Sequence, residues 1–511
     1  MNTIESELSV SDIVDVAVNK NIPSGFDNQP NFEKLEACKI YLEDFVKLGG
    51  IVYGVTTGLG SSSKNQFTPE DAALLQKNLI RYHGCGVGPA LSASQCRATL
   101  LLRIHCLSRG YSGVRPELIS HLKTMLKSDV IPWIPSRGSV GASGDLTPLS
   151  YVAAAASGER YCYFKGKKIR SASALERAGL KPWVFEGREA LALMNGTSVM
   201  TAVASLAWSQ ADAVSKTACQ LSGLLAELLQ ARSAPFFPEI HRLKGHKGQI
   251  HAAEKILSYI HQPVARIHSD PTLKAEVQDV YSLRCSPQII GVLNDALIWT
   301  RQLIETEANS INDNPIFIPE QELVLNGGNF FGGHIAVSCD TLKTSVANVV
   351  NLADRQFALM MEKGMSGYLT ENLVSPAANR VHLQHGFKGI QITMSAICAE
   401  VIKRSQPMSI YSRSTESRNQ DVVSMGTTAA LELDALLQMS QKALSILGMA
   451  IIQGFLVLEQ SGRQPVLNQQ ASSLLHGMRS VFPGTDEDCE LDESIESMND
   501  YLFGNQDNDE I

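Results

Sequence analysis

The stretch TAVASLAWSQADAVSKTACQLSGLLAELLQAR, residues 201–232, decides the fold class of this chain. Its apolar residues recur at spacings that keep one face of a helix apolar, and it contains no proline. Residues 340–363 and 427–459 are also rich in Ala, Leu, Gln and Met. Alternation typical of strands occurs only near residues 161–169. The sequence therefore predicts a mainly α protein with a bundle of long core helices.

Composition sets the limits for function. The chain has 511 residues, of which 44% are hydrophobic, so a sizeable core is possible. The net charge of -8 is concentrated at the end, because residues 485–511 carry eleven Asp and Glu and no Lys or Arg. A basic stripe with interleaved aromatic residues is missing. We therefore expect no nucleic-acid partner, and an end of the chain that is a solvated acidic tail.

Several features predict a cytoplasmic protein without a membrane partner. The first twenty residues lack the positive and apolar regions of a secretory signal. The ten cysteines form no CxxC pair and no Cys/His cluster, which argues against a zinc site or a disulfide framework. The most apolar run, residues 443–458, is interrupted by Gly and Gln and is too short for a comfortable span. We expect it to be a buried helix.

Segments rich in Gly, Ser and Thr near residues 54–63, 135–145 and 326–333 interrupt the predicted helices and indicate loops. Such loops, held on a rigid helical scaffold, are where chemistry is expected. We predict an active-site region over residues 1–200, a bundle of long helices over residues 201–480 and the acidic tail over residues 481–511.

The segment SRGSVGASGDLTPLS, residues 136–150, is the most informative of these loops. It is not a phosphate-binding loop, because no Lys-Ser/Thr follows the glycines. It is not a hydrolase nucleophile elbow either, because Asp145 stands where the second Gly of GxSxG is needed. On spacing alone it predicts a tight turn that leads into a helix, with Asp145 as the N-cap and the helix continuing to Ala156.

The same segment resembles the signature of the histidine, phenylalanine and tyrosine ammonia-lyases and the related aminomutases. Their prosthetic group is methylidene-imidazolone, which the resemblance places on Ala142, Ser143 and Gly144. The amide nitrogen of Gly144 would attack the carbonyl carbon of Ala142, which an unhindered glycine in a bent backbone does readily. Ser143 would then lose its hydroxyl as water. The resulting methylidene would accept the substrate amine as an electrophile that no ordinary side chain offers.

Further blocks are similar to the family in the same order along the chain. YGVTTGLG, residues 53–60, looks like the mobile catalytic loop, with Tyr53 removing the β-proton and Gly60 in the substrate site. A tyrosine is a poor base at neutral pH unless positive charge or hydrogen bonds stabilise its phenolate. MNGT, residues 194–197, matches the block in which the asparagine, here Asn195, hydrogen-bonds the cofactor.

Three blocks nearer the end of the chain complete the resemblance. QDVYSLRC, residues 278–285, implies that Tyr281 takes part in cofactor and proton chemistry and that Arg284 clamps the substrate carboxylate. The GNF element implies a place for Phe330 beside the substrate ring. The NDNP segment, which begins at Asn312, is similar to another part of the family's active site.

Two positions bear on the substrate. His83, in the pair Tyr82-His83, indicates a polar substrate ring, because members selective for phenylalanine carry an apolar pair there. A core histidine with its partners elsewhere is the alternative. Histidine enzymes place a glutamate where Gln420 stands, and a neutral amide suits a phenol better. The resemblance therefore implies L-tyrosine first, giving 4-coumarate and ammonia, with histidine ammonia-lyase or tyrosine 2,3-aminomutase as alternatives.

The resemblance also implies an architecture and an assembly. Members have a long central helical bundle of the ammonia-lyase and fumarase type, with a loop-rich N-terminal part that carries the cofactor. They are typically homotetramers whose active sites are shared between chains. No metal and no nucleotide is needed for the reaction. A non-catalytic helical scaffold is the remaining alternative, since fold alone does not imply function.

Overall fold

A computed structural model of the chain describes residues 7–23, 26, 32–58, 60, 64, 69–263, 278–362 and 368–504. The described chain is mainly helical, so the predicted fold class is confirmed. It divides into two compact units. Unit 1 comprises Met1–Ser209, Arg301–Asp340 and Pro407–Asp434, and unit 2 comprises Gln210–Thr300, Thr341–Gln406 and Ala435–Ile511. The predicted division at residues 200 and 480 stays a prediction.

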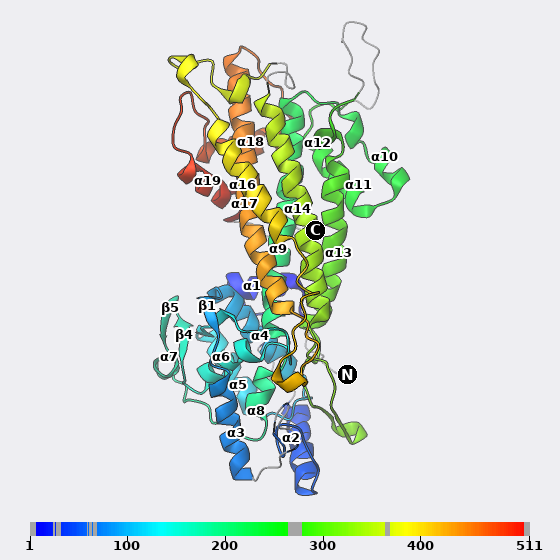
Figure 1. Ribbon diagram of the computed structural model, residues 1–511, viewed down its shortest axis with the longest axis vertical. Helices are drawn as coiled ribbons and strands as arrows, with labels where there is room; N and C mark the ends of the chain where they lie inside the picture. Colours follow the sequence, from blue (N-terminus) through cyan, green and yellow to red (C-terminus); the bar gives the residue numbers. More distant parts are fainter. Residues whose placement is uncertain are drawn as a thin grey trace. The chain divides into compact units, whose positions relative to one another are not determined.

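Four long helices each contribute residues to both units. They are α9 (Ser198–Leu228), α13 (Ser286–Ala308), α14 (Gly333–Met361) and α17 (Gly426–Gln460). In unit 2 they run alongside one another and alongside α16 (Lys388–Arg404), as Figure 1 shows. Three of the four correspond to the predicted long helices, and α13 was not predicted.

Burial explains why these segments are helices. In α9, Val203, Ala207 and Val214 lie on a fully buried apolar face. The helix α17 is apolar on most of its surface and is long enough to cross a membrane by length and composition alone. However, 83% of its most apolar window is buried inside the protein. It is a core helix, as predicted for residues 443–458.

The rest of unit 2 consists of short elements around the bundle. They are η3 (Ala234–Phe236), α10 (Pro238–Lys244), α11 (Lys247–Leu257), α12 (Tyr281–Arg284), η5 (Glu371–Leu373), η6 (Val381–Leu383), α18 (Gln469–Val481), α19 (Asp492–Asn499) and η8 (Asp500–Gly504). Part of the acidic end is packed, because Asp488 accepts hydrogen bonds from the backbone of His385 and Gly386 at 2.8 Å each. Residues 505–511 of the predicted tail lie outside the described residues.

Among the described residues, unit 1 combines helices with short antiparallel strands. Its helices are α1 (Val10–Val18), α2 (Phe32–Lys47), α3 (Pro69–Tyr82), α4 (Ala93–Ser108), α5 (Pro116–Lys127), α6 (Leu146–Ala156), α7 (Ser171–Arg177), α8 (Glu189–Met194), η4 (Pro319–Gln321) and η7 (Glu416–Arg418). Its antiparallel strand pairs and sheet are β1 (Val87–Ala90) with β3 (Pro135–Arg137), β2 (Val130–Pro132) with β4 (Tyr161–Phe164) and β5 (Lys167–Arg170), and β6 (Ile316–Ile318) with β7 (Leu323–Leu325). The strands expected near residues 161–169 are the β4–β5 hairpin.

The helix α6 is the central element of unit 1. It packs against α3 and α8, and every residue from Thr147 to Ala156 is buried. Its alanine-rich sequence allows this close packing, because small side chains let neighbouring helices approach. The helix begins two residues after Gly144, as the sequence predicted, so Ala142, Ser143 and Gly144 lie directly before its start.

Candidate active site

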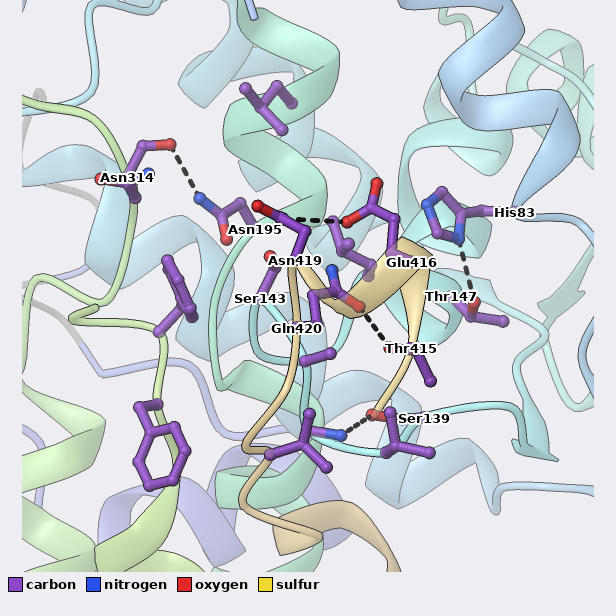
Figure 2. A pocket seen from close by; sticks show the side chains of 18 of the residues that line it. His83, Ser139, Ser143, Thr147, Asn195, Asn314, Thr415, Glu416, Asn419 and Gln420 are labelled. Carbon is purple, nitrogen blue, oxygen red and sulfur yellow. Dashed lines mark hydrogen bonds between the residues drawn. The ribbon is translucent and has the colours of Figure 1, made fainter. Parts of the chain in front are cut away.

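A cavity of about 820 Å³ in unit 1 brings together most of the predicted site residues. Figure 2 shows the side chains that line it. The predicted residues among them are Tyr53, Tyr82, His83, Ala142, Ser143, Asn195, Phe330 and Gln420. These residues come from segments that are far apart in the sequence, and their roles stay predictions.

The backbone of the tripeptide is sharply bent. Gly141, Ser143 and Gly144 have positive φ angles of 76°, 49° and 70°. A Cβ at position 144 would lie 2.1 Å from the carbonyl oxygen of Gly196, so only glycine fits there. Ser143 has no such freedom and is held in a left-handed conformation that costs free energy. Attack of the Gly144 nitrogen on the Ala142 carbonyl would require both this bend and a glycine at position 144.

Asp145 fastens the end of this loop to two long helices. Its fully buried carboxylate accepts hydrogen bonds from the Val199 and Met200 amides, at 3.0 and 2.9 Å, and from the Thr427 hydroxyl. It therefore caps α9 with its side chain, whereas the sequence predicted it only as the N-cap of its own helix, where its side chain makes no bond. Burial raises the pKa of Asp145 to about 6, although these hydrogen bonds oppose the rise.

Asn195 presents one atom of its amide without a protein partner. Its Nδ2 donates to the Asn314 carbonyl at 2.8 Å and to Asp313 Oδ1 at 3.3 Å. Both partners are acceptors, so the orientation of the amide is chemically determined. Among the described residues, the buried Oδ1 has no hydrogen-bond partner. Asn195 lines the cavity with this acceptor unsatisfied, which is the state expected of a group that awaits a ligand or cofactor.

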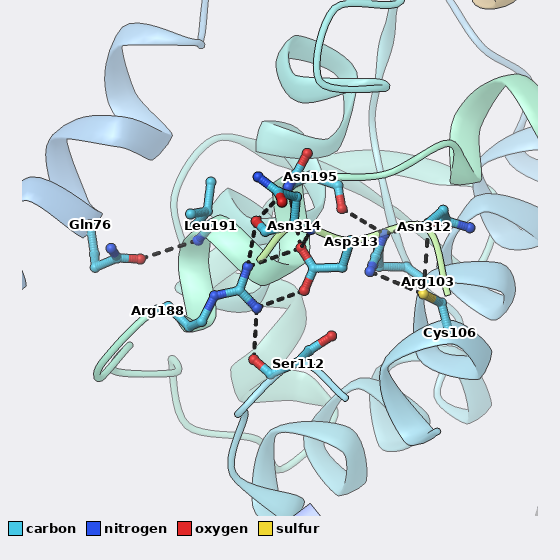
Figure 3. A network of polar contacts seen from close by, with 10 residues as sticks. All are labelled: Gln76, Arg103, Cys106, Ser112, Arg188, Leu191, Asn195, Asn312, Asp313 and Asn314. Atoms are coloured by element: carbon cyan, nitrogen blue, oxygen red, sulfur yellow. Dashed lines mark hydrogen bonds and ion pairs between the residues drawn. The ribbon is translucent and has the colours of Figure 1, made fainter. Parts of the chain in front are cut away.

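A buried polar network, shown in Figure 3, contacts the backbone and the side chain of Asn195. Arg188 and Asp313 form a bidentate ion pair with N–O distances of 2.6 and 3.0 Å, and neither side chain is exposed. Arg103 donates to the Asn195 carbonyl at 3.0 Å and to Asn312 Oδ1 at 3.1 Å. Asn312 is therefore part of this support and does not line the cavity, and its predicted contact with substrate stays a prediction.

Tyr53 is mostly buried, and its hydroxyl accepts a hydrogen bond from the Gly60 amide at 2.7 Å. Gly60 itself does not line the cavity. Burial and the carboxylate of Glu416 raise the pKa of Tyr53, and the Gly60 hydrogen bond only partly opposes them. The described residues of one chain therefore leave the pKa of Tyr53 above its ordinary value and do not favour its phenolate.

His83 lies at the right of the view in Figure 2, and Asn195 lies nearer its middle. Its Nδ1 lies 3.0 Å from the Thr147 hydroxyl on α6. Burial and the nearby Arg160 lower the pKa of His83 to about 4, so its ring is neutral at physiological pH. Tyr82 packs beside it with ring centroids 4.4 Å apart, and 57% of Tyr82 is exposed. A neutral imidazole in this cavity can bond a polar substrate ring.

The loop that carries Gln420 also brings two residues that the sequence analysis missed, Glu416 and Asn419. The Gln420 side chain accepts from the Thr415 hydroxyl at 2.7 Å, and Asn419 donates to Glu416 at 3.2 Å. Residues 416–418 all have positive φ, between 52° and 68°, which is costly for side chains other than glycine. Nothing in the polar run STESRNQD distinguishes Glu416 by periodicity, so only its nearness to Gln420 could have drawn attention to it.

Two predicted residues lie in unit 2. Tyr281 and Arg284 belong to the short helix α12, where the guanidinium stacks on the phenol ring with its carbon 4.5 Å from the centroid. Tyr281 is 69% exposed. Neither residue lines the cavity within this single chain.

Comparisons with known proteins identify the family of this chain. The family model for aromatic amino acid lyase matches residues 8–479. The histidine ammonia-lyase of Myxococcus xanthus strain DK1622 is 36% identical over 448 residues, covering 87% of this chain and 86% of that protein. The chain belongs to the aromatic amino acid lyase family.

Solved structures of the family have the same fold. The tyrosine aminomutase from Streptomyces globisporus has a TM-score of 0.89 at 30% identity, covering 98% of this chain and 95% of that one. The histidine ammonia-lyase from Trypanosoma cruzi has a TM-score of 0.85 at 27% identity, covering 97% and 92%. The predicted family, fold type and enzyme class, a carbon–nitrogen lyase, are confirmed for this aromatic amino acid lyase.

Proposed function

We propose that this aromatic amino acid lyase is an ammonia-lyase that converts L-tyrosine to 4-coumarate and ammonia. The observation that carries the proposal is the neutral, braced His83 in the same cavity as Ser143. A buried imidazole can hydrogen-bond a phenol, and a pocket built around that bond disfavours phenylalanine because its own polar group is then left unpaired.

We further propose methylidene-imidazolone as its cofactor, formed from Ala142, Ser143 and Gly144. The bent backbone and the close approach of Gly144 to Gly196 fit the cyclisation. The unsatisfied Oδ1 of Asn195 fits a polar neighbour in the cavity. When present, the group supplies an electrophile for the substrate amine.

The side chains of the protein would divide the remaining work. Tyr53 would remove the β-proton, and Phe330 would face the substrate ring. Asn195 would hydrogen-bond the cofactor, and together with Gln420 it would tune the cofactor ring. Arg284 would bind the substrate carboxylate through its planar fork.

Tyr281 and Arg284 do not line the cavity of their own chain, so their proposed roles require a second copy of the chain. We propose a homotetramer in which these residues complete the cavity of a neighbouring chain. Positive charge brought by Arg284 would also lower the pKa of Tyr53, which burial raises within one chain. We expect the protein to act in the cytoplasm, in agreement with buried free thiols such as Cys96, Cys106 and Cys162.

Two other activities have specific support. The relative from Myxococcus xanthus is a histidine ammonia-lyase, and the carboxylate of Glu416 in the cavity would suit an imidazole substrate. The solved structure from Streptomyces globisporus is a tyrosine aminomutase, and an aminomutase would use the same site to return nitrogen to the β-carbon.

The test is to incubate the purified protein separately with L-tyrosine, L-histidine and L-phenylalanine, and to measure ammonia and the organic product. Coumarate with equimolar ammonia from tyrosine is the expected result. Urocanate as the main product would show that Glu416 outweighs Gln420 in setting the substrate. A β-amino acid with little free ammonia would identify an aminomutase.

A further inference from the structure

One face of α6 holds the loop that carries His83. Thr147, Ser150 and Tyr151 are spaced at i, i+3 and i+4, which places them on the same side of the helix. Thr147 bonds the His83 ring at 3.0 Å, and the Tyr151 hydroxyl accepts from the Gly86 amide at 3.1 Å. The single proton of the Ser150 hydroxyl lies between the Thr147 carbonyl at 2.7 Å and the His83 carbonyl at 3.2 Å. Both ends of the segment 83–86 are thus fixed to α6.

Arg160, which lies outside α6, contacts two of these α6 side chains and the end of α3. One guanidinium nitrogen donates to the Ser150 hydroxyl at 2.9 Å, and another donates to the Ile80 carbonyl in α3. The guanidinium also lies over the Tyr151 ring, with its carbon 4.4 Å from the centroid. A single planar side chain therefore joins the end of α3 to two of the three side chains on α6 that hold the loop.

Arg160 also acts on His83 through its charge. Its positive charge adds to burial in lowering the pKa of the imidazole. The other titratable groups that act on this pair are Tyr151, Glu159 and Cys85 around Arg160, and Tyr82 beside His83. Of these, Glu159 forms an ion pair of 2.8 Å with Arg81. Its negative charge is therefore not available to Arg160 alone.

We infer that Arg160 is a positioning residue for substrate choice, which fixes the His83 ring relative to Ser143 by clamping the loop of residues 83–86 to α6. The helix makes this connection direct, because α6 starts two residues after Gly144 and carries Thr147 one residue later. The distance between the ring-recognising imidazole and the reacting end is then set by one rigid helix. The inference rests on the proposed function, in which His83 contacts the substrate ring.

The test compares R160Q and R160K with the control K47Q, which removes an exposed ion pair on α2 of the same unit. The readout is the ratio of kcat/KM for L-tyrosine to that for L-phenylalanine. R160Q should lower this ratio about ten- to hundredfold, because small displacements of a positioned group have effects of that size. R160K keeps the charge but not the planar fork, so its ratio should fall less. K47Q should leave the ratio unchanged.

A second measurement, the pKa of His83, distinguishes an effect on His83 from a general loss of activity. The pKa of His83, followed by NMR on protein with labelled histidine, should rise from about 4 towards its ordinary value in R160Q and stay low in R160K and K47Q. An unchanged ratio and an unchanged His83 pKa in R160Q would overturn the inference. A wild-type enzyme without any preference for a polar ring would instead refute the proposed function, and the pKa comparison would still test the link between Arg160 and His83.

Discussion

The buried ion pair behind Asn195 offers a quantitative test of how the site is supported. Arg188 donates to both oxygens of Asp313, to the Ser112 carbonyl at 2.7 Å and to the Asn314 carbonyl at 2.9 Å. Neither charged side chain is exposed. The change D313N would leave the arginine charge buried without a counter-charge, and it would weaken one of the two bonds that orient the Asn195 amide.

The expected loss in the free energy of unfolding is about 3–5 kcal/mol, the size found when one partner of a buried ion pair is removed. Urea unfolding followed by tryptophan fluorescence suits the measurement, because three of the four tryptophans, Trp133, Trp183 and Trp208, belong to unit 1. The control E159Q removes an exposed ion pair and should cost no more than about 1 kcal/mol.

The double change R188M/D313L refines the test. Because it removes both charges together, it should restore most of the lost stability but leave Asn195 without its carboxylate partner, so activity should stay low. If D313N destabilised the protein no more than E159Q does, the ion pair would not be the support of Asn195 that the structure indicates.

Three further predictions concern single side chains. H83F should lower kcat/KM for L-tyrosine by about a hundredfold or more and raise that for L-phenylalanine, measured as product formation; equal losses for both substrates would contradict a role in ring recognition. E416Q removes the negative charge that raises the pKa of Tyr53, so the ascending limb of the pH profile of kcat/KM, on which the base loses its proton, should move to lower pH; an unmoved limb would argue against Tyr53 as the base. Burial lowers the pKa of His105 from 6.5 to about 4 in the folded protein, so the unfolded chain binds more protons between these two pH values. The free energy of unfolding should therefore rise with pH across that window. H105Q should reduce this rise in urea titrations, and an identical slope would contradict the argument from burial.

The long helices were predictable because their signal is local. The spacing of apolar residues in α9 and α17 follows from which faces are buried. The helix α13 was missed because its buried stripe, which includes Ile290, Leu293 and Ile304, is broken by the polar Thr300 and by charged neighbours. Its burial depends on helices from other parts of the chain, and a sequence window does not contain that information.

The sharp turn at Gly141 to Gly144 could be expected from its small residues, whereas contacts between distant segments could not. Asp145 caps α9, which begins more than fifty residues later, so its main partners could not be inferred from its own helix. Glu416 reaches the cavity through a strained loop, and Arg160 acts through α6. These relations arise from tertiary packing of polar side chains, for which a single sequence offers no periodic signal.

The mass of the proteolytic peptide that spans residues 138–150 tests the central claim most directly. If Ala142, Ser143 and Gly144 form methylidene-imidazolone, this peptide should be lighter than its sequence mass by two water molecules, and the same peptide from S143A should have its full sequence mass and come from an inactive enzyme. A wild-type peptide of full sequence mass, isolated from protein that releases ammonia from tyrosine, would contradict the account.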